Sequence, residues 1–238
     1  MEIRFHGHSC FELSDGDARL LVDPFLKPNN PAAVASAEEV DATHIAVSHA
    51  HIDHIADAVP VATRTGAECV AIVEVANWLS EQGVEEVHDP NLGGTVRFDW
   101  GWVKLVPAWH TSTIAGSEEA PYSPTPGTVT GTPAGLVVSI GGVTVYHAGD
   151  TCLFGDMRLI AERNPIDVAI LPIGGHYTMD RHDAVAAAEM IGAGTVIPMH
   201  YDTFGPIETD AEAFKAEVEA KTSSRVVLLA PGETHSTG

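Results

Sequence analysis

The hexapeptide at residues 49–54, His-Ala-His-Ile-Asp-His, narrows more than any other feature what this chain can fold into. It follows an apolar run that predicts a β-strand, and a loop backbone there can aim His49 and His51 at one point. Asp53 and His54 are expected to begin the next helix. Several ligands on one short loop keep the entropic cost of assembling a metal site low. The segment therefore predicts a metal-binding loop at the end of a strand.

Apolar periodicity along the chain predicts an α/β protein. Short β-like runs dominate the first hundred residues, and strands then alternate with helices. Residues 1–238, with 45% hydrophobic content, are long enough to bury the core of a single domain. Residues 114–133 are rich in Gly, Pro, Ser and Thr, so we expect a flexible active-site flap that joins two halves of the domain. Residues 235–238 are expected to be a loose end.

Five segments carry the most definite predictions of secondary structure. The apolar runs at 44–49 and 69–73 are predicted to be strands, and residues 55–65 and 74–82 are predicted to be helices. Residues 135–149 alternate apolar and polar side chains around a central glycine pair, which predicts a β-hairpin.

The charge balance argues against polyanionic partners. The chain has 33 acidic and 12 basic residues, a formal net charge of −21, and no cluster of Lys or Arg in the sequence. Such a field repels nucleic acid and anionic membranes. We therefore expect a small-molecule substrate as the partner, no nucleic acid and no membrane, while assembly into a homo-oligomer stays open.

The cysteines and the first residues of the chain indicate the cellular compartment in which the protein is expected. Cys10, Cys69 and Cys152 are isolated in apolar settings, which indicates core packing rather than disulfides or a CxxC metal site. Met1 is not followed by a charged segment and an apolar one, and no apolar run reaches the roughly 18 residues of a membrane span. A cytoplasmic location is predicted.

The hexapeptide fits the HxHxDH signature of the metallo-β-lactamase superfamily of dinuclear metal hydrolases, which it resembles. The superfamily's remaining ligands fall on His110 in "VPAWHTST", Asp150 in "VYHAGDT" and His200 in "VIPMHYDTF". The resemblance implies a first ion bound by His49, His51 and His110, a second bound by Asp53, His54 and His200, and a bridging Asp150.

Longer segments resemble the UPF0173 group of metal-dependent hydrolases, relatives of the UlaG-like lactonases. They include "FHGHSCFEL", "LLVDPF" and "DVAILPIGGHYTM", and the resemblance runs nearly from end to end. It implies a four-layer αββα sandwich of two pseudo-symmetric halves, with the site along one edge. It also implies two divalent ions, for which we expect zinc or manganese, and attack by a metal-bound hydroxide.

Three residues are candidates for catalytic roles: Asp53, His8 and His176. His8 lies in a GHxxF-like block that the group shares near its site, so a structural role and a contact with substrate or ligands both stay open. At His176 the chain has Gly-His where the group commonly has Asp-Asn, and this histidine either faces the metal site or caps the helix that begins near residue 180. His147 could orient Asp150, and Asp23 could fix a ligand's ring N–H.

The sequence thus favours a dinuclear hydrolase of a small ester, lactone or phosphodiester. One alternative is a metal-binding sensor without catalysis, in which protein ligands would fill every coordination position. Another is an RNA-processing phosphodiesterase of the same superfamily, which would need a basic exosite that the sequence does not show. The substrate and the metal are not fixed by these residues.

Overall fold

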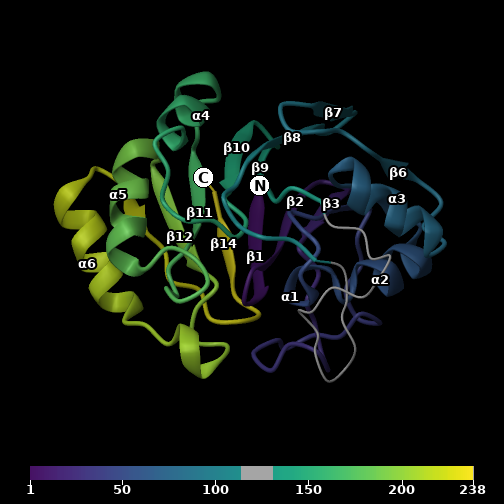
Figure 1. Ribbon diagram of the computed structural model, residues 1–238, viewed down its shortest axis with the longest axis horizontal. Helices are drawn as coiled ribbons and strands as arrows, with labels where there is room; N and C mark the ends of the chain where they lie inside the picture. Colours follow the sequence, from purple (N-terminus) through teal and green to yellow (C-terminus); the bar gives the residue numbers. More distant parts are fainter. Residues whose placement is uncertain (114–130, 238) are drawn as a thin grey trace.

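Two β-sheets lie face to face at the centre of the protein, and helices cover their outer sides (Figure 1). The computed structural model describes residues 1–113 and 131–237. Helices from the first half of the chain lie on one side of the strands, and helices from the second half lie on the other. This arrangement confirms the predicted αββα sandwich, which hides the inner faces of both sheets from water.

The first sheet places the last strand of the chain beside the first. Antiparallel pairing of Ile3 with His235 shows that the expected loose end is wrong for residues 235 and 236. In sheet order the strands are β14 (Thr234–Ser236), β1 (Glu2–Gly7), β2 (Cys10–Asp15), β3 (Ala18–Val22), β4 (His44–Ala46), β5 (Glu68–Val70) and β6 (Val87–His88).

The second sheet contains the predicted hairpin. Gly141 and Gly142 form its turn with φ of 56° and 76°, and a Cβ at Gly141 would lie 2.7 Å from the side chain of Asp15, so the turn favours glycine there. In sheet order the strands are β13 (Arg225–Val226), β12 (Thr195–Met199), β11 (Val168–Pro172), β10 (Val143–His147), β9 (Ala134–Ile140), β8 (Gly101–Pro107) and β7 (Thr95–Phe98).

The helices lie where they were predicted, except that one predicted helix is divided into two. The helix expected over 55–65 is divided at Asp57, whose carboxylate accepts hydrogen bonds from the backbone of Leu26 and the side chain of Asn29. The helix expected over 74–82 is confirmed to within one residue. The helices are α1 (Ile52–Ile55), α2 (Ala58–Thr65), α3 (Val73–Glu81), α4 (Met157–Arg163), α5 (Arg181–Ile191) and α6 (Ala211–Lys221), with a 3₁₀ turn at Gly205–Ile207.

The strands expected over 44–49 and 69–73 are shorter than predicted. β4 ends at Ala46 and β5 ends at Val70. Beyond Ala46 the chain leaves the sheet and forms the loop that carries His49 and His51. Strand periodicity therefore predicted the strand that precedes the metal loop, but not the residue at which that strand ends.

Apolar side chains fill the space between the sheets and the space beneath the helices of the second half. On β1 the side chains of Ile3 and Phe5 are buried while Glu2 and Arg4 are exposed, as strand periodicity requires. Tyr146 of β10 and Phe214 of α6 belong to the second apolar layer. These two layers fix the strand ends from which the site is built.

No helix in the described parts of the chain is long and apolar enough to cross a membrane. The predicted loop at 114–133 lies almost wholly outside the described residues. The division into two pseudo-symmetric halves and the cytoplasmic location stay predictions.

Candidate metal centre

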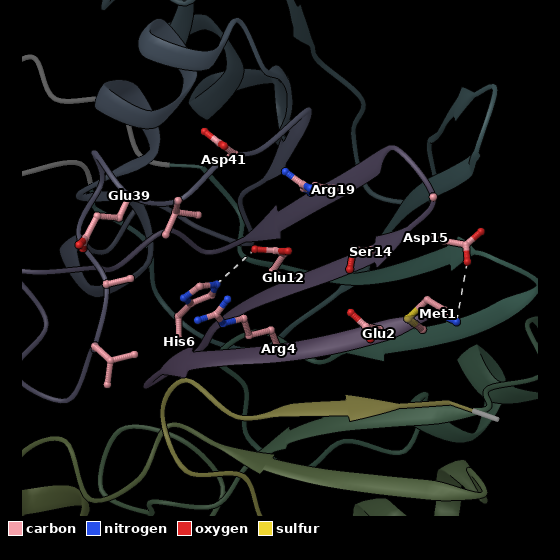
Figure 2. A pocket seen from close by; sticks show the side chains of 14 residues that line it. Met1, Glu2, Arg4, His6, Glu12, Ser14, Asp15, Arg19, Glu39 and Asp41 are labelled. Carbon is pink, nitrogen blue, oxygen red and sulfur yellow. Dashed lines mark ion pairs between the residues drawn. The ribbon is translucent and has the colours of Figure 1, made fainter.

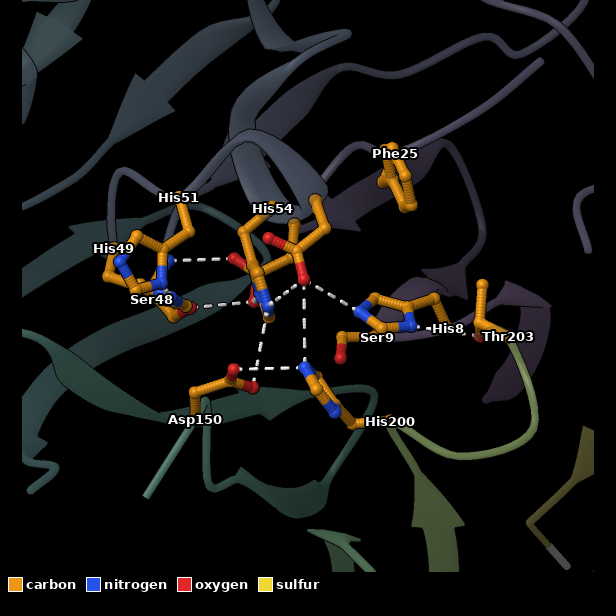
Figure 3. A network of polar contacts seen from close by, with 12 residues as sticks. His8, Ser9, Phe25, Ser48, His49, His51, His54, Asp150, His200 and Thr203 are labelled. Carbon is orange, nitrogen blue, oxygen red and sulfur yellow. Dashed lines mark hydrogen bonds and ion pairs between the residues drawn. The ribbon is translucent and has the colours of Figure 1, made fainter. Parts of the chain in front are cut away.

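Histidine and aspartate side chains from both sheets converge at one edge of the sandwich (Figure 3). The loop after β4 supplies His49 and His51, and the short helix α1 supplies Asp53 and His54. The later strands β8, β10 and β12 are followed by His110, Asp150 and His200 respectively. Strand ends are suitable for holding such groups because the packed sheets fix their backbones.

Three imidazoles form one group of potential ligands. His49 Nε2 lies 3.0 Å from His51 Nδ1, and His110 Nε2 lies 3.2 Å from the same atom. Three ring nitrogens that face one another so closely repel through their lone pairs unless a proton or a cation lies among them. This group has the ligand chemistry of a zinc-type site.

A second group gathers around the carboxylate of Asp53. Its Oδ2 lies 3.0 Å from His8 Nε2, 3.6 Å from His200 Nε2 and 3.8 Å from His54 Nε2. Figure 3 shows the rings of His8, His54 and His200, from different parts of the chain, turned toward a common point. His8, on the turn between β1 and β2, therefore joins the three residues that the resemblance assigned to the second ion.

Asp150 lies between the two groups. Its Oδ1 is 3.4 Å from His54 Nε2, and its Oδ2 is 3.0 Å from His200 Nε2 and 3.6 Å from His110 Nε2. Of the two carboxylates, Asp150 thus contacts a histidine of each group, which is the position that a bridging ligand needs. The side chain is 2% exposed, so these contacts are made away from bulk water.

Burial and neighbouring charges divide the histidines by their pKa values. Burial, followed by His200, lowers the pKa of His8 to about 4, and burial with His110 lowers the pKa of His51 to about 4. For His200, burial opposes the charged ring, but Asp150 and Asp53 outweigh it and raise the pKa to about 9.

His54 behaves like His200, because burial is outweighed by the carboxylates of Asp150, Asp23 and Asp53, which together raise its pKa. The histidines in turn lower the pKa of Asp53 and of Asp150, against the effect of burial. Without metal at neutral pH, the site therefore holds two ionised carboxylates beside two protonated imidazoles.

Asp23, fully buried at the end of β3, orients two of the ligands. Its carboxylate accepts hydrogen bonds of 2.7 Å from the backbone N–H and the hydroxyl of Ser48, and one of 2.8 Å from His54 Nδ1. The Ser48 hydroxyl also lies 3.0 Å from His49 Nδ1. Asp23 thereby turns the Nε2 atoms of both rings toward the site, which makes it a positioning residue.

His147 and Gly149 shape the turn that carries Asp150. His147 Nε2 lies 3.0 Å from the carbonyl of Ser9, and the N–H of Gly149 donates to His147 Nδ1. Gly149 has a φ of 62°, and a Cβ there would lie 2.6 Å from the carbonyl oxygen of Ala134. The turn therefore requires glycine, and the predicted orienting role of His147 acts through the backbone.

The substitution Asp23→Asn is expected to lower metal affinity by about 10- to 100-fold. The amide keeps the shape of the side chain but replaces one acceptor with an N–H group that cannot receive the bond from His54. Competition with a chromophoric chelator measures the affinity. Asp57→Asn is the matched control, because Asp57 is another buried carboxylate and accepts from Leu26 instead of a histidine. Equal affinities of the two variants would contradict the role of Asp23.

A cavity of about 590 Å³ opens onto the metal-type ligands. His51, Asp53, His110, Asp150 and His200 contribute to its wall. The remaining lining residues are Thr111, Thr113, Tyr177, Phe204 and Pro206. The site therefore has room for a bound molecule beside its ligand atoms.

His176 is not among the residues that line this cavity. It is exposed, and its ring packs against Tyr177 with the centroids 4.5 Å apart. The second role considered for it is wrong, because α5 is capped by Asp180, whose side chain accepts from the backbone of His182 and Asp183. The neighbouring Tyr177 lines the cavity instead, and nothing in its sequence context indicated this.

The structure thus brings together the seven residues expected as ligands and His8. Their roles toward a metal stay predictions. Sequence reasoning missed Tyr177, Phe204 and Thr203, of which Thr203 has its Oγ1 2.9 Å from His8 Nδ1. A hydroxyl group or an aromatic ring in a loop carries no functional signal of its own until the fold places it beside the site.

Comparison with known proteins shows similarity along nearly the whole chain. A family model described as "Beta-lactamase superfamily domain" matches residues 2–200. A UPF0173 metal-dependent hydrolase of Pelotomaculum thermopropionicum is 44% identical over 98% of this chain and 99% of its own. A second one, from Methanopyrus kandleri, is 45% identical over 99% of each chain.

One solved structure is similar to this chain in both fold and sequence. Igni18, described as a novel metallo hydrolase from the archaeon Ignicoccus hospitalis, is 34% identical. It superposes with a TM-score of 0.86 over 98% of this chain and 97% of its own.

Proposed function

Because this chain belongs to the β-lactamase superfamily and is a metal-dependent hydrolase of its UPF0173 group, we propose that it binds two divalent cations and hydrolyses a small ester, lactone or phosphodiester. The observation that carries the proposal is the pair of ligand groups joined by Asp150 at the bottom of a cavity. Zinc and manganese are the cations that we expect, since imidazole and carboxylate ligands suit both.

Unsatisfied atoms within the site support the fit of these cations. In the described structure, Asp53 Oδ1 is buried without a hydrogen-bond partner, and His54 Nε2 and Asp150 Oδ1 are buried with only the 3.4 Å ion pair between them. An unpaired buried polar atom costs about 1–3 kcal/mol, and more when it is charged. A bound cation would use these atoms as ligands and offset that cost.

His49, His51 and His110 would hold one cation, Asp53, His54 and His200 the other, and Asp150 both. His8 would complete the second set. The Thr203 hydroxyl donates to the carbonyl of Tyr201, so it can accept from His8 Nδ1–H, which leaves the lone pair of Nε2 facing Asp53. Two acceptors 3.0 Å apart need a proton or a cation between them.

Two divalent cations supply a nucleophile from water at neutral pH and polarise the oxygen of the scissile group. The chain's own contribution is to orient them. Asp23 and Ser48 fix the rings of His54 and His49, and the side chains of Asp53 and Asp150 are themselves buried, at 6% and 2% exposed. Asp53 lines the cavity, where its carboxylate can pass a proton to or from a bound molecule, which supports its predicted catalytic role. His8 does not line the cavity and contacts Asp53 instead, so its predicted catalytic role stays a prediction.

The function is tested by metal loading followed by a substrate panel. We expect about two equivalents of zinc or manganese per chain by elemental analysis. We also expect hydrolysis of at least one class among 4-nitrophenyl esters, lactones and bis(4-nitrophenyl) phosphate, lost with a chelator and restored by metal. Two bound equivalents with no turnover of any class would favour the non-catalytic sensor, and one equivalent would contradict the dinuclear site.

A further inference from the structure

We propose that the substrate of this site is an uncharged acyl compound, an ester or lactone, whose apolar substituent packs against Phe204, Pro206 and Tyr177. The proposal rests on the hydrolase function proposed above and narrows its substrate class. It excludes phosphodiesters and carboxylate-bearing esters as good substrates.

The first observation is the chemistry of the cavity wall. Beyond the metal-type ligands, its described lining consists of two threonines, an aromatic pair and a proline, and no Lys or Arg is among them. Residues 114–130, which the structure does not describe, contain no Lys or Arg in their sequence either. No basic side chain from either set is thus available to neutralise an anionic substrate beside the cations.

The second observation is that arginine side chains line a different cavity of the protein. A larger cavity of about 670 Å³ on the outer face of β1, β2 and β3 is lined by Arg4 and Arg19, among carboxylates that include Glu12 (Figure 2). Residues of the metal centre do not contribute to it. Arg4 and Arg19 thus belong to a cavity separate from the metal centre, while the formal charge of −21 repels anions from the surface.

The third observation is that the apolar wall is built in advance of binding. The turn around Phe204 is closed by hydrogen bonds from Asp202 N to the Ile207 carbonyl and from Ile207 N to the Phe204 carbonyl. The Phe204 ring meets His8 edge-on at a centroid distance of 5.5 Å. An aromatic ring fixed beside a ligand group costs little entropy on binding, so it favours apolar substituents near the scissile bond.

The first test compares substrates that differ only in charge or chain length. With the metal-loaded protein, kcat/KM is measured for 4-nitrophenyl acetate, butyrate and hexanoate, and for mono-4-nitrophenyl glutarate against its methyl ester. We expect a rise of roughly fourfold for each methylene that is buried. We expect the methyl ester to exceed the anionic glutarate at least about tenfold. Equal values for the glutarate pair would overturn the proposal and leave the hydrolase function intact.

Variants then locate the effect. Phe204→Ala should reduce the ratio of hexanoate to acetate turnover, because the wall is lost. Phe98→Ala is the matched control, since Phe98 on β7 packs against His44 and Trp100, does not line the cavity and should leave the ratio unchanged. A Phe204→Ala ratio equal to that of the unchanged chain would also overturn the proposal.

A binding measurement does not depend on turnover or on the variants. Titration calorimetry compares hexanohydroxamic acid with the monohydroxamate of succinic acid, two metal-binding compounds with an apolar and an anionic tail. Tighter binding of the apolar compound is expected, and tighter binding of the anionic one would overturn the proposal. Apolar preference without hydrolysis of any ester would show instead that the hydrolase function fails while the pocket's preference holds.

Discussion

Replacing Asp150 by asparagine is expected to reduce hydrolysis by about a thousandfold and to weaken the binding of both cations. Asp150 contacts His54 and His200 of one ligand group and His110 of the other, so its charge is shared by both groups. The amide keeps the size of the side chain but removes the negative charge and one acceptor. Metal content and initial rates, measured on the same preparation, check both parts of the expectation.

His235→Gln is the control for this substitution. His235 lies on β14, which pairs with β1 away from the metal loop, so its replacement should change neither metal content nor rate. Unfolding midpoints of the three proteins separate a local effect from general loss of structure. An Asp150→Asn protein that hydrolyses substrate at the unchanged rate would show that Asp150 is not a ligand.

Affinity for the cation that Asp53, His54 and His200 would hold is expected to fall by up to about a hundredfold for each unit of pH below neutrality. The pKa of His200 is raised to about 9 in the metal-free protein, and that of His54 is raised as well, so both rings carry protons at neutral pH. The cation that Asp53, His54 and His200 would hold must displace both protons to bind, whereas the cation at His49, His51 and His110 meets rings whose pKa values are lowered. The sign follows from this competition: affinity rises with pH and levels off above the pKa of His200.

The slope of affinity against pH tests this expectation most directly. Two displaced protons give a slope near 2 for the logarithm of affinity against pH, measured by chelator competition between about pH 6 and 8. His8 and His51, whose pKa values are lowered to about 4, add to the slope only in more acidic solution. A slope near zero would show that neither His54 nor His200 is protonated. Activity lost in acid while both cations stay bound would point to a separate titrating base.

The sequence by itself determined those features that depend on neighbouring residues. Strand and helix periodicity predicted the hairpin of β9 and β10 and the helix α3, because side-chain burial alternates with the backbone repeat. The hexapeptide at 49–54 predicted a metal loop because its ligand-type residues share one turn of chain. Resemblance to a known family then supplied His110, Asp150 and His200, which no local pattern marks as a set.

Tertiary structure alone decided which distant residues meet. His8 reaches Asp53 across 45 positions of the chain, and Thr203 reaches His8 across 195, and only the packing of the two sheets sets these separations. The same holds for β14, a segment too short and polar to be recognised until β1 offers its unpaired edge. His176 shows the reverse case: it looked like a site residue in sequence, but a φ of 40° and an exposed loop place Tyr177 in the cavity wall instead. The residue types alone indicate which side chains can bind a metal. The shape and polarity of the cavity depend on backbone turns that bring distant loops to one sheet edge.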